Sequence, residues 1–162
     1  MTTRMPHILV VDDEPHLRNG LRRVLEKEGY EVTTAPDGET ALKIAREKEP
    51  DVVLLDIMMP GMDGREVCRR IREVVTAIQV IYITARAEPN DPLQLKQLRS
   101  EAEAFITKPA TSKRIISTVN SLSRSARQQP EKPQPYGTGQ LTGAGNRPQS
   151  TKTSEGDRQP AR

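Results

Sequence analysis

The chain has 162 residues, enough for one domain of ordinary size and a tail. Residues 1–126 carry as many acidic as basic side chains, so the net charge of +3 comes from residues 127–162, and a neutral main part argues against a nucleic-acid-binding domain. A single Cys excludes an internal disulfide and a metal site of several thiols. No apolar run is long enough to span a bilayer, so we expect a soluble protein of the cytoplasm with no membrane partner.

Short apolar or β-branched runs predict five strands, over residues 7–11, 31–35, 51–55, 78–83 and 104–107. Helical spacing predicts a helix after each of them, carrying Leu17, Leu21, Val24 and Leu25, then Ala41, Leu42 and Ala45, then Val67, Ile71 and Val74, then Leu95 and Leu98, and finally Ile115, Ile116, Val119 and Leu122. The fourth helix is expected to start near Pro92. Strands that alternate with helices predict an α/β fold, a five-stranded parallel sheet, doubly wound, with helices on both faces.

Residues 127–162 differ in composition from the rest of the chain. They are rich in Pro, Gln, Gly and Ser or Thr and contain few apolar side chains. Such a segment cannot bury enough apolar surface to offset the entropy of an ordered chain. We therefore predict one domain over residues 1–126 and a disordered tail over residues 127–162, with no DNA-binding output domain after residue 126.

Residues suited to chemistry stand where four of the predicted strands end. Asp12 and Asp13 follow the first strand, Asp56 the third, Thr84 ends the fourth, and Lys108 follows the fifth. Each alone has an ordinary explanation: a helix cap, a solvated acid or a surface lysine. Ligands of open parallel sheets, however, bind outside the carboxyl ends of the strands. The joint pattern therefore favours a single site.

Three carboxylates at one sheet edge repel each other, and a hard cation such as Mg²⁺ would offset the repulsion. Asp13 and Asp56 suit direct ligation, and Asp12 suits ligation through water. Asp56 can also act as a nucleophile toward phosphorus. Lys108 and the Thr84 hydroxyl would then stabilise the oxygens of a transferred phosphoryl group.

Four segments of the chain resemble the receiver domain of bacterial and archaeal response regulators. They are Ile8–Pro15, Asp51–Gly64, Ile83–Ala85 and Thr107–Pro109. The resemblance covers about residues 5–125 and is most specific around Asp56. It implies a flavodoxin-like (βα)5 receiver fold and a phosphoprotein of two-component signal transduction.

The resemblance also implies roles for individual residues. Asp56 would receive the phosphoryl group from a histidine kinase, forming an aspartyl phosphate. The Mg²⁺ ligands would be Asp12, Asp13, Asp56 and the main-chain carbonyl of Met58. Thr84 and Lys108 would contact the phosphoryl group, and the Lys108–Pro109 bond would be cis. Thr84 and Phe105 would be the switch residues that remodel the face formed by the fourth helix, fifth strand and fifth helix.

Two departures from the family pattern concern the region before the fifth strand. Glu101-Ala102 stands where the family usually has Gly-Ala, and a non-Gly residue is disfavoured in the left-handed conformation that ends many helices. The Pro89–Pro92 stretch is also atypical. We expect an altered fourth helix and an unaltered acceptor site.

Three other functions are weighed against a phosphoryl acceptor. A docking scaffold that works without phosphorylation would not need all the site residues. A phosphohydrolase that turns over would need a second Asp where Met58 stands, so we expect no turnover enzyme. Nucleic-acid binding by the tail has only its weak positive charge in support. Without an output domain, the phosphorylated surface would bind a downstream protein or pass the group on in a phosphorelay to a histidine phosphotransfer protein; phosphorylation-dependent homodimerisation is left open.

Overall fold

A computed structural model describes residues 4–85 and 92–128 of the chain. Strands and helices alternate along it in the order β1 (His7–Val11), α1 (Pro15–Lys27), β2 (Glu31–Ala35), α2 (Gly38–Lys48), β3 (Val52–Asp56), α3 (Gly64–Val74), β4 (Gln79–Thr84), α4 (Pro92–Glu101), β5 (Ala104–Thr107) and α5 (Ser112–Arg127). All the predicted strands and helices are therefore present, and α4 does begin at Pro92. No helix among the described residues is long and apolar enough to cross a membrane.

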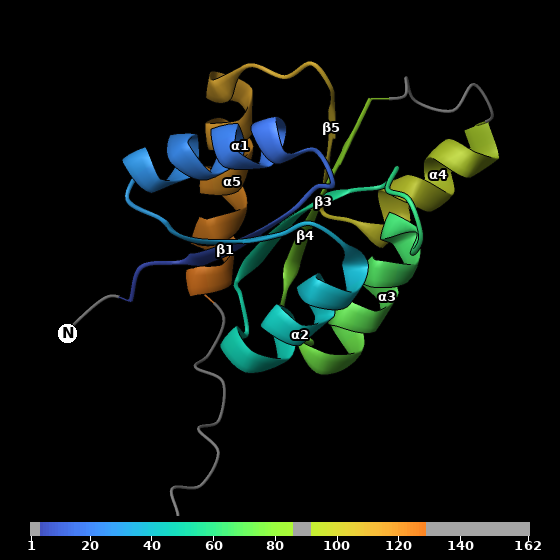
Figure 1. The fold of residues 1–162 in the computed structure, drawn as a ribbon, viewed down its shortest axis with the longest axis horizontal. Helices are drawn as coiled ribbons and strands as arrows, with labels where there is room; N and C mark the ends of the chain where they lie inside the picture. The colour runs from blue at the N-terminus through green and yellow to red at the C-terminus, as the bar shows by residue number, and fades with distance from the viewer. Residues whose placement is uncertain (1–3, 86–91, 129–162) are drawn as a thin grey trace, which may run out of the picture. The chain divides into compact units, whose positions relative to one another are not determined.

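The five strands form one parallel sheet in the order β2-β1-β3-β4-β5. In this order the chain moves first to one side of β1 and then to the other, so the sheet is doubly wound and β1 and β3 lie side by side at the point of reversal. The predicted fold class is confirmed. Figure 1 shows α1 and α5 on one side of the sheet and α2, α3 and α4 on the other.

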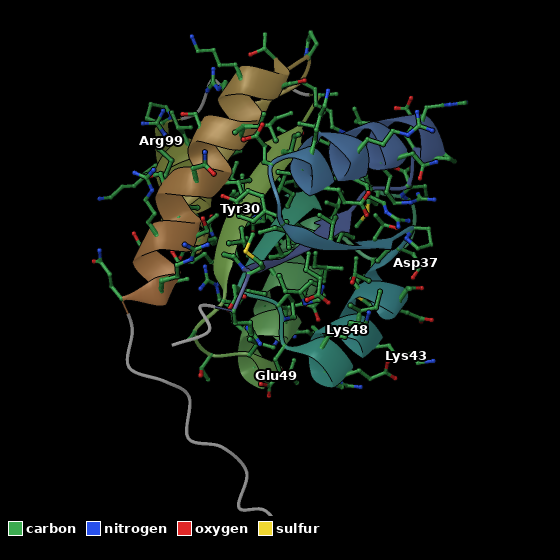
Figure 2. The ribbon with its side chains drawn as sticks, turned by 90° about the vertical axis from the view of Figure 1, so that its left-hand side faces the viewer. Tyr30, Asp37, Lys43, Lys48, Glu49 and Arg99 are labelled. Atoms are coloured by element: carbon green, nitrogen blue, oxygen red, sulfur yellow. The ribbon has the colours of Figure 1, made fainter. Side chains whose placement is uncertain are left out.

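The strand side chains alternate between two buried layers because successive residues of a strand point to opposite faces. One layer packs against α2 and α3, with Leu98 of α4 partly buried on it; its strand residues include Leu9, Val11, Val53, Leu55, Val80 and Tyr82. The other packs against α1 and α5; its strand residues include Ile8, Val10, Val52, Leu54, Ile81 and Ile83. Tyr30, labelled in Figure 2, connects the second layer to α5: its hydroxyl donates a hydrogen bond to Asn120 Oδ1 and forms another with the Ser123 hydroxyl.

Short polar side chains fix where the helices begin. Asp37 accepts a hydrogen bond from the Thr40 N–H at 2.7 Å before α2, and Asp63 accepts one from the Arg65 N–H at 2.9 Å before α3. After α1 the chain turns through Gly29, whose φ of +88° suits glycine. These local signals set where α2 and α3 begin and where the chain returns from α1 to the sheet.

Two expectations need correction. Val74 does not share the buried face of α3: it is 38% exposed, and Cys68 and Val75 are buried instead, because the inward face of the helix lies one residue away from the predicted one at its end. Glu101 ends α4 without the left-handed conformation, which among the described non-glycine residues occurs at Glu49. Residues 86–91 and the predicted tail from residue 129 onward lie outside the described residues.

Candidate functional site

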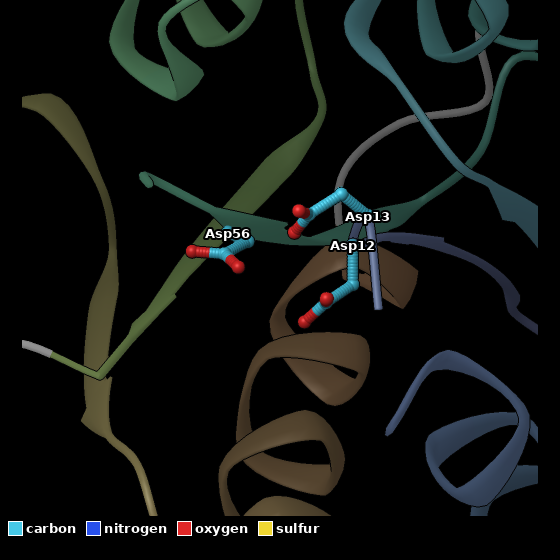
Figure 3. A group of neighbouring side chains, drawn as sticks. All are labelled: Asp12, Asp13 and Asp56. Carbon is cyan, nitrogen blue, oxygen red and sulfur yellow. The ribbon is translucent and has the colours of Figure 1, made fainter. Parts of the chain in front are cut away.

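The three predicted acids meet at the carboxyl edge of the sheet. One carboxylate oxygen from each of Asp12, Asp13 and Asp56 lies within 4.8 Å of the others (Figure 3). Asp12 is fully buried and Asp56 is 4% exposed, whereas Asp13 is exposed. The cluster forms where β1 and β3 end side by side, as the doubly wound order requires.

Lys108 supplies the positive charge at this edge. Its Nζ donates hydrogen bonds to Asp12 Oδ2 at 2.7 Å and to Asp56 Oδ2 at 3.0 Å, and its side chain is 15% exposed. Burial disfavours the charged amine, but the two carboxylates outweigh burial and raise the pKa of Lys108. Its main-chain N–H donates to the Thr84 carbonyl at 2.7 Å, and the Lys108–Pro109 bond is cis as expected.

The Asp56 carboxylate is held on both oxygens. Oδ1 accepts the main-chain N–H of Met58 at 2.9 Å, and Oδ2 accepts Lys108. Burial nevertheless raises the pKa of Asp56, against the effect of these two donors and together with the nearby charge of Asp12. The structure thus keeps a charged, oriented carboxylate in a place where charge is costly.

Asp12 is also fully engaged, whereas Asp13 faces solvent. Asp12 Oδ1 accepts the Glu14 N–H at 2.9 Å, and Oδ2 accepts Lys108. Asp12 therefore stabilises the turn before α1, but the N-cap residue of that helix is Glu14, with no side-chain cap. The helix-cap explanation accounts for only part of what these acids do.

The predicted switch residues lie on the two strands beyond β3. Thr84 is 3% exposed at the end of β4, one residue past Ile83, the partner of Asp56 in the β3–β4 register. Phe105 lies in β5, partly buried against the layer that contains Tyr82. The Met58 side chain is 46% exposed beside the acceptor.

Two residues that support the site were not predicted. Arg18, in the first turns of α1, donates from Nη1 to the main-chain carbonyl of Asp12 at 2.6 Å. Gly64 packs so closely behind the acceptor that a Cβ there would lie 2.4 Å from the Asp56 carbonyl oxygen. Nothing in the sequence separates Arg18 from other helix arginines, but a glycine at the start of a helix two residues after a turn was visible as a candidate for close backbone contact.

Comparison with known proteins assigns a family. The sequence pattern of the family described as "Response regulator receiver domain" matches residues 8–120. The chain is 37% identical over 121 residues to the transcriptional regulatory protein AfsQ1 of Streptomyces coelicolor, covering 74% of this chain and 52% of AfsQ1. It is 38% identical over 117 residues to the alkaline phosphatase synthesis transcriptional regulatory protein PhoP of Bacillus subtilis, covering 72% of this chain and 48% of PhoP.

A solved structure agrees with these matches. The response regulator protein TrrA of Thermotoga maritima, in complex with Mg²⁺-BeF, superimposes with a TM-score of 0.64 and 37% identity, covering 73% of this chain and 99% of TrrA. The chain spans about half the length of the curated relatives it matches. The matched part corresponds to the sheet, its helices and the acidic edge.

Proposed function

The chain belongs to the response regulator receiver domain family, and on that premise we propose that it accepts a phosphoryl group on Asp56 in two-component signalling. The observation that carries the proposal is the environment of Asp56. Its carboxylate lies at the end of β3 beside two further acids and is oriented by Lys108 and the Met58 N–H. A carboxylate held in this way can attack phosphorus.

In the proposed step, one oxygen of the Asp56 carboxylate attacks the phosphorus of a phosphohistidine. An O–P bond forms, the N–P bond of the donor breaks, and the histidine nitrogen keeps the electron pair. The donor is a histidine kinase or a histidine phosphotransfer protein. Lys108 remains beside the new phosphoryl oxygens as their cation, and the Thr84 hydroxyl donates a hydrogen bond to them. With Met58 two residues after Asp56, where a phosphohydrolase would need an acid, we propose no turnover of a separate substrate.

The acidic cluster suits Mg²⁺. Carboxylates are the oxygen ligands that this ion takes, and the exposed Asp13 leaves room for the water and phosphate oxygens that complete its coordination. Asp13, Asp56 and the Met58 carbonyl would hold the ion directly, and the fully buried Asp12 would hold it through water. When bound, Mg²⁺ neutralises charge that develops on the phosphoryl oxygens.

We propose that the output is a change of surface. Thr84 would move toward the phosphoryl group, and Phe105 would turn further inward. The face formed by α4, β5 and α5 would then bind a downstream protein or present the group for phosphorelay. Within residues 4–85 and 92–128, every helix and strand is part of the receiver fold.

The test is intact-mass spectrometry after incubation with acetyl phosphate, with and without Mg²⁺. We expect one Mg²⁺-dependent phosphate adduct on the wild type and none on Asp56→Asn. Asp63→Asn is the matched control: it neutralises an acid of the same loop that lies outside the cluster and can still cap α3. If the wild type takes no adduct from acetyl phosphate or a cognate kinase, the docking scaffold becomes the better explanation.

A further inference from the structure

The C-terminal end of α4 is held by side chains from two neighbouring elements. The Glu101 carboxylate accepts hydrogen bonds from Nε and Nη2 of Arg65, the first at 2.8 Å, and from the Tyr82 hydroxyl at 3.4 Å. The Glu101 main-chain carbonyl accepts from Arg72 at 3.0 Å and from the Cys68 thiol at 3.7 Å. Residues of α3 and β4 therefore converge on the last residue of α4. We call the trio of Arg65, Glu101 and Tyr82 the α4 clamp.

The clamp has the features of a strong polar contact. Arg65 and Glu101 form a bidentate pair, the favourable geometry for a guanidinium and a carboxylate. Their side chains are 38% and 27% exposed, so solvent screens the pair only in part. Tyr82 is fully buried, and its hydroxyl donates to the Glu101 carboxylate. Losing the carboxylate would leave a buried hydroxyl and an arginine without this partner.

Apolar packing of α4 is sparse in comparison. Leu95 and Leu98 are partly buried, Leu98 against the core, whereas Leu93 is 77% exposed. Figure 1 shows α4 at the periphery, with its C-terminal end next to α3. The clamp therefore adds polar contacts to a helix that, among its described residues, has only two partly buried leucines to hold it.

The clamp connects α4 to two of the segments that carry the acceptor chemistry, the end of β4 and the chain that follows β3. Tyr82 and Thr84 are two residues apart on β4, so their side chains leave the strand on the same face. Arg65 follows Gly64, which packs against the Asp56 carbonyl. A displacement of either segment at the site acts directly on a residue of the clamp.

We propose that the α4 clamp is a latch that holds α4 in its unphosphorylated position and is released when Asp56 is phosphorylated. The inference rests on the proposed function of Asp56. If the clamp exists in only one of two states, its loss favours the other state, and phosphorylation must in turn weaken the clamp by the same factor. Opening the latch by mutation therefore mimics part of the activation.

The experiment compares the wild type with Glu101→Gln, an isosteric change that removes the charge. Glu66→Gln is the control, because Glu66 pairs with Arg69 and Arg70 within α3 itself. Hydrogen–deuterium exchange of α4 is measured in two conditions: without a phosphodonor, and with beryllofluoride and Mg²⁺ as the mimic of the phosphoryl group. The rate of labelling by acetyl phosphate is measured separately for each protein.

We expect Glu101→Gln to raise exchange in α4 several-fold while leaving α1 and α2 unchanged, and to raise the labelling rate about fivefold. Beryllofluoride should raise exchange in α4 of the wild type and add little in the variant. Arg65→Gln should match Glu101→Gln, and the double variant should add nothing further.

Three results would overturn the latch: unchanged exchange in α4 of Glu101→Gln, the same gain in Glu66→Gln, or faster exchange with no gain in labelling. The last result would leave the clamp a purely structural contact. A wild type that takes neither acetyl phosphate nor beryllofluoride would refute the proposed function instead, and the coupling of the latch to activation with it.

Discussion

Gly64 allows the sharpest test of how the backbone supports the acceptor. A Cβ at this position would lie 2.4 Å from the Asp56 carbonyl oxygen and 2.6 Å from the Ile57 Cα, where ordinary contacts are 3.4–4 Å. The neighbours in question are main-chain atoms, so no side-chain rotation can relieve the overlap. In Gly64→Ala, α3 or the Asp56–Ile57 chain must therefore move by about 1 Å.

Such forced overpacking costs about 1–3 kcal/mol of unfolding free energy. The better helix propensity of alanine returns less than about 1 kcal/mol at the first position of a helix. We therefore expect Gly64→Ala to unfold at lower urea concentration, measured by far-UV circular dichroism. Because the movement reaches the Asp56 main chain, labelling by acetyl phosphate should also fall by roughly tenfold or more.

Gly20→Ala is the matched control. Gly20 lies inside α1 with open space where a Cβ would be, so alanine should raise the free energy of unfolding by roughly 0.5–1 kcal/mol and leave labelling unchanged. A Gly64→Ala protein as stable and as readily labelled as the wild type would show that the close approach behind Asp56 is not a real constraint.

Three further predictions concern the titration of His7, the hydrogen bonds of the Tyr30 hydroxyl and the charge of Lys108. Burial and the charge of Lys48 lower the pKa of the His7 imidazole, although Glu31 acts in the opposite direction. The contribution of neutral His7 to stability is therefore complete above about pH 6.5, and it is lost as the pH falls through the lowered pKa of the folded state. In urea unfolding at several pH values His7→Gln should therefore lose less stability on acidification than the wild type, and equal losses would contradict this. Tyr30→Phe should cost about 1–2 kcal/mol in the same assay, because it strands hydrogen-bonding groups next to the buried Ser123; a cost below about 0.5 kcal/mol would mean that water replaces the hydroxyl. Lys108→Met should bind Mg²⁺ several-fold more tightly by calorimetry, because the amine no longer neutralises the acids, yet be labelled by acetyl phosphate at least about tenfold more slowly; weaker Mg²⁺ binding would refute the competition.

The sequence predicts best those features that depend on short, local patterns. The chain is apolar over the four residues that directly precede Asp56, so both the buried strand β3 and the position of the acceptor at its end follow from the strand rule. Lys108 and Asp12 are 96 residues apart in the chain, but their contact too could be expected, because parallel strands bring their carboxyl ends to one edge.

Features that depend on the rotation and packing of a helix against the sheet were not predictable from local patterns. Val74 and Val75 are adjacent and equally apolar, and only the final rotation of α3 decides that Val75 is buried. Glu101 was expected to disturb α4 because a non-glycine residue is disfavoured in the left-handed conformation that ends many helices. It instead ends the helix without that conformation and binds Arg65 and Tyr82, which are 36 and 19 residues away and come from two other elements. The tertiary fold brings such distant side chains together, so neither the spacing of residues nor the composition of the chain indicates the contact.

The charges at the acidic edge explain how stability and function are joined there. Two of the three acids are almost fully buried, a costly arrangement unless each charge has partners. Lys108 provides one positive charge for three carboxylates, so the ionised site keeps two negative charges, as many as one divalent cation neutralises. Without the ion, the remaining carboxylates repel each other, and relief of this repulsion contributes to the free energy with which the ion binds. A site whose own lysine neutralised it fully would be more stable, but it would hold neither the metal ion nor the phosphoryl group that we propose it receives.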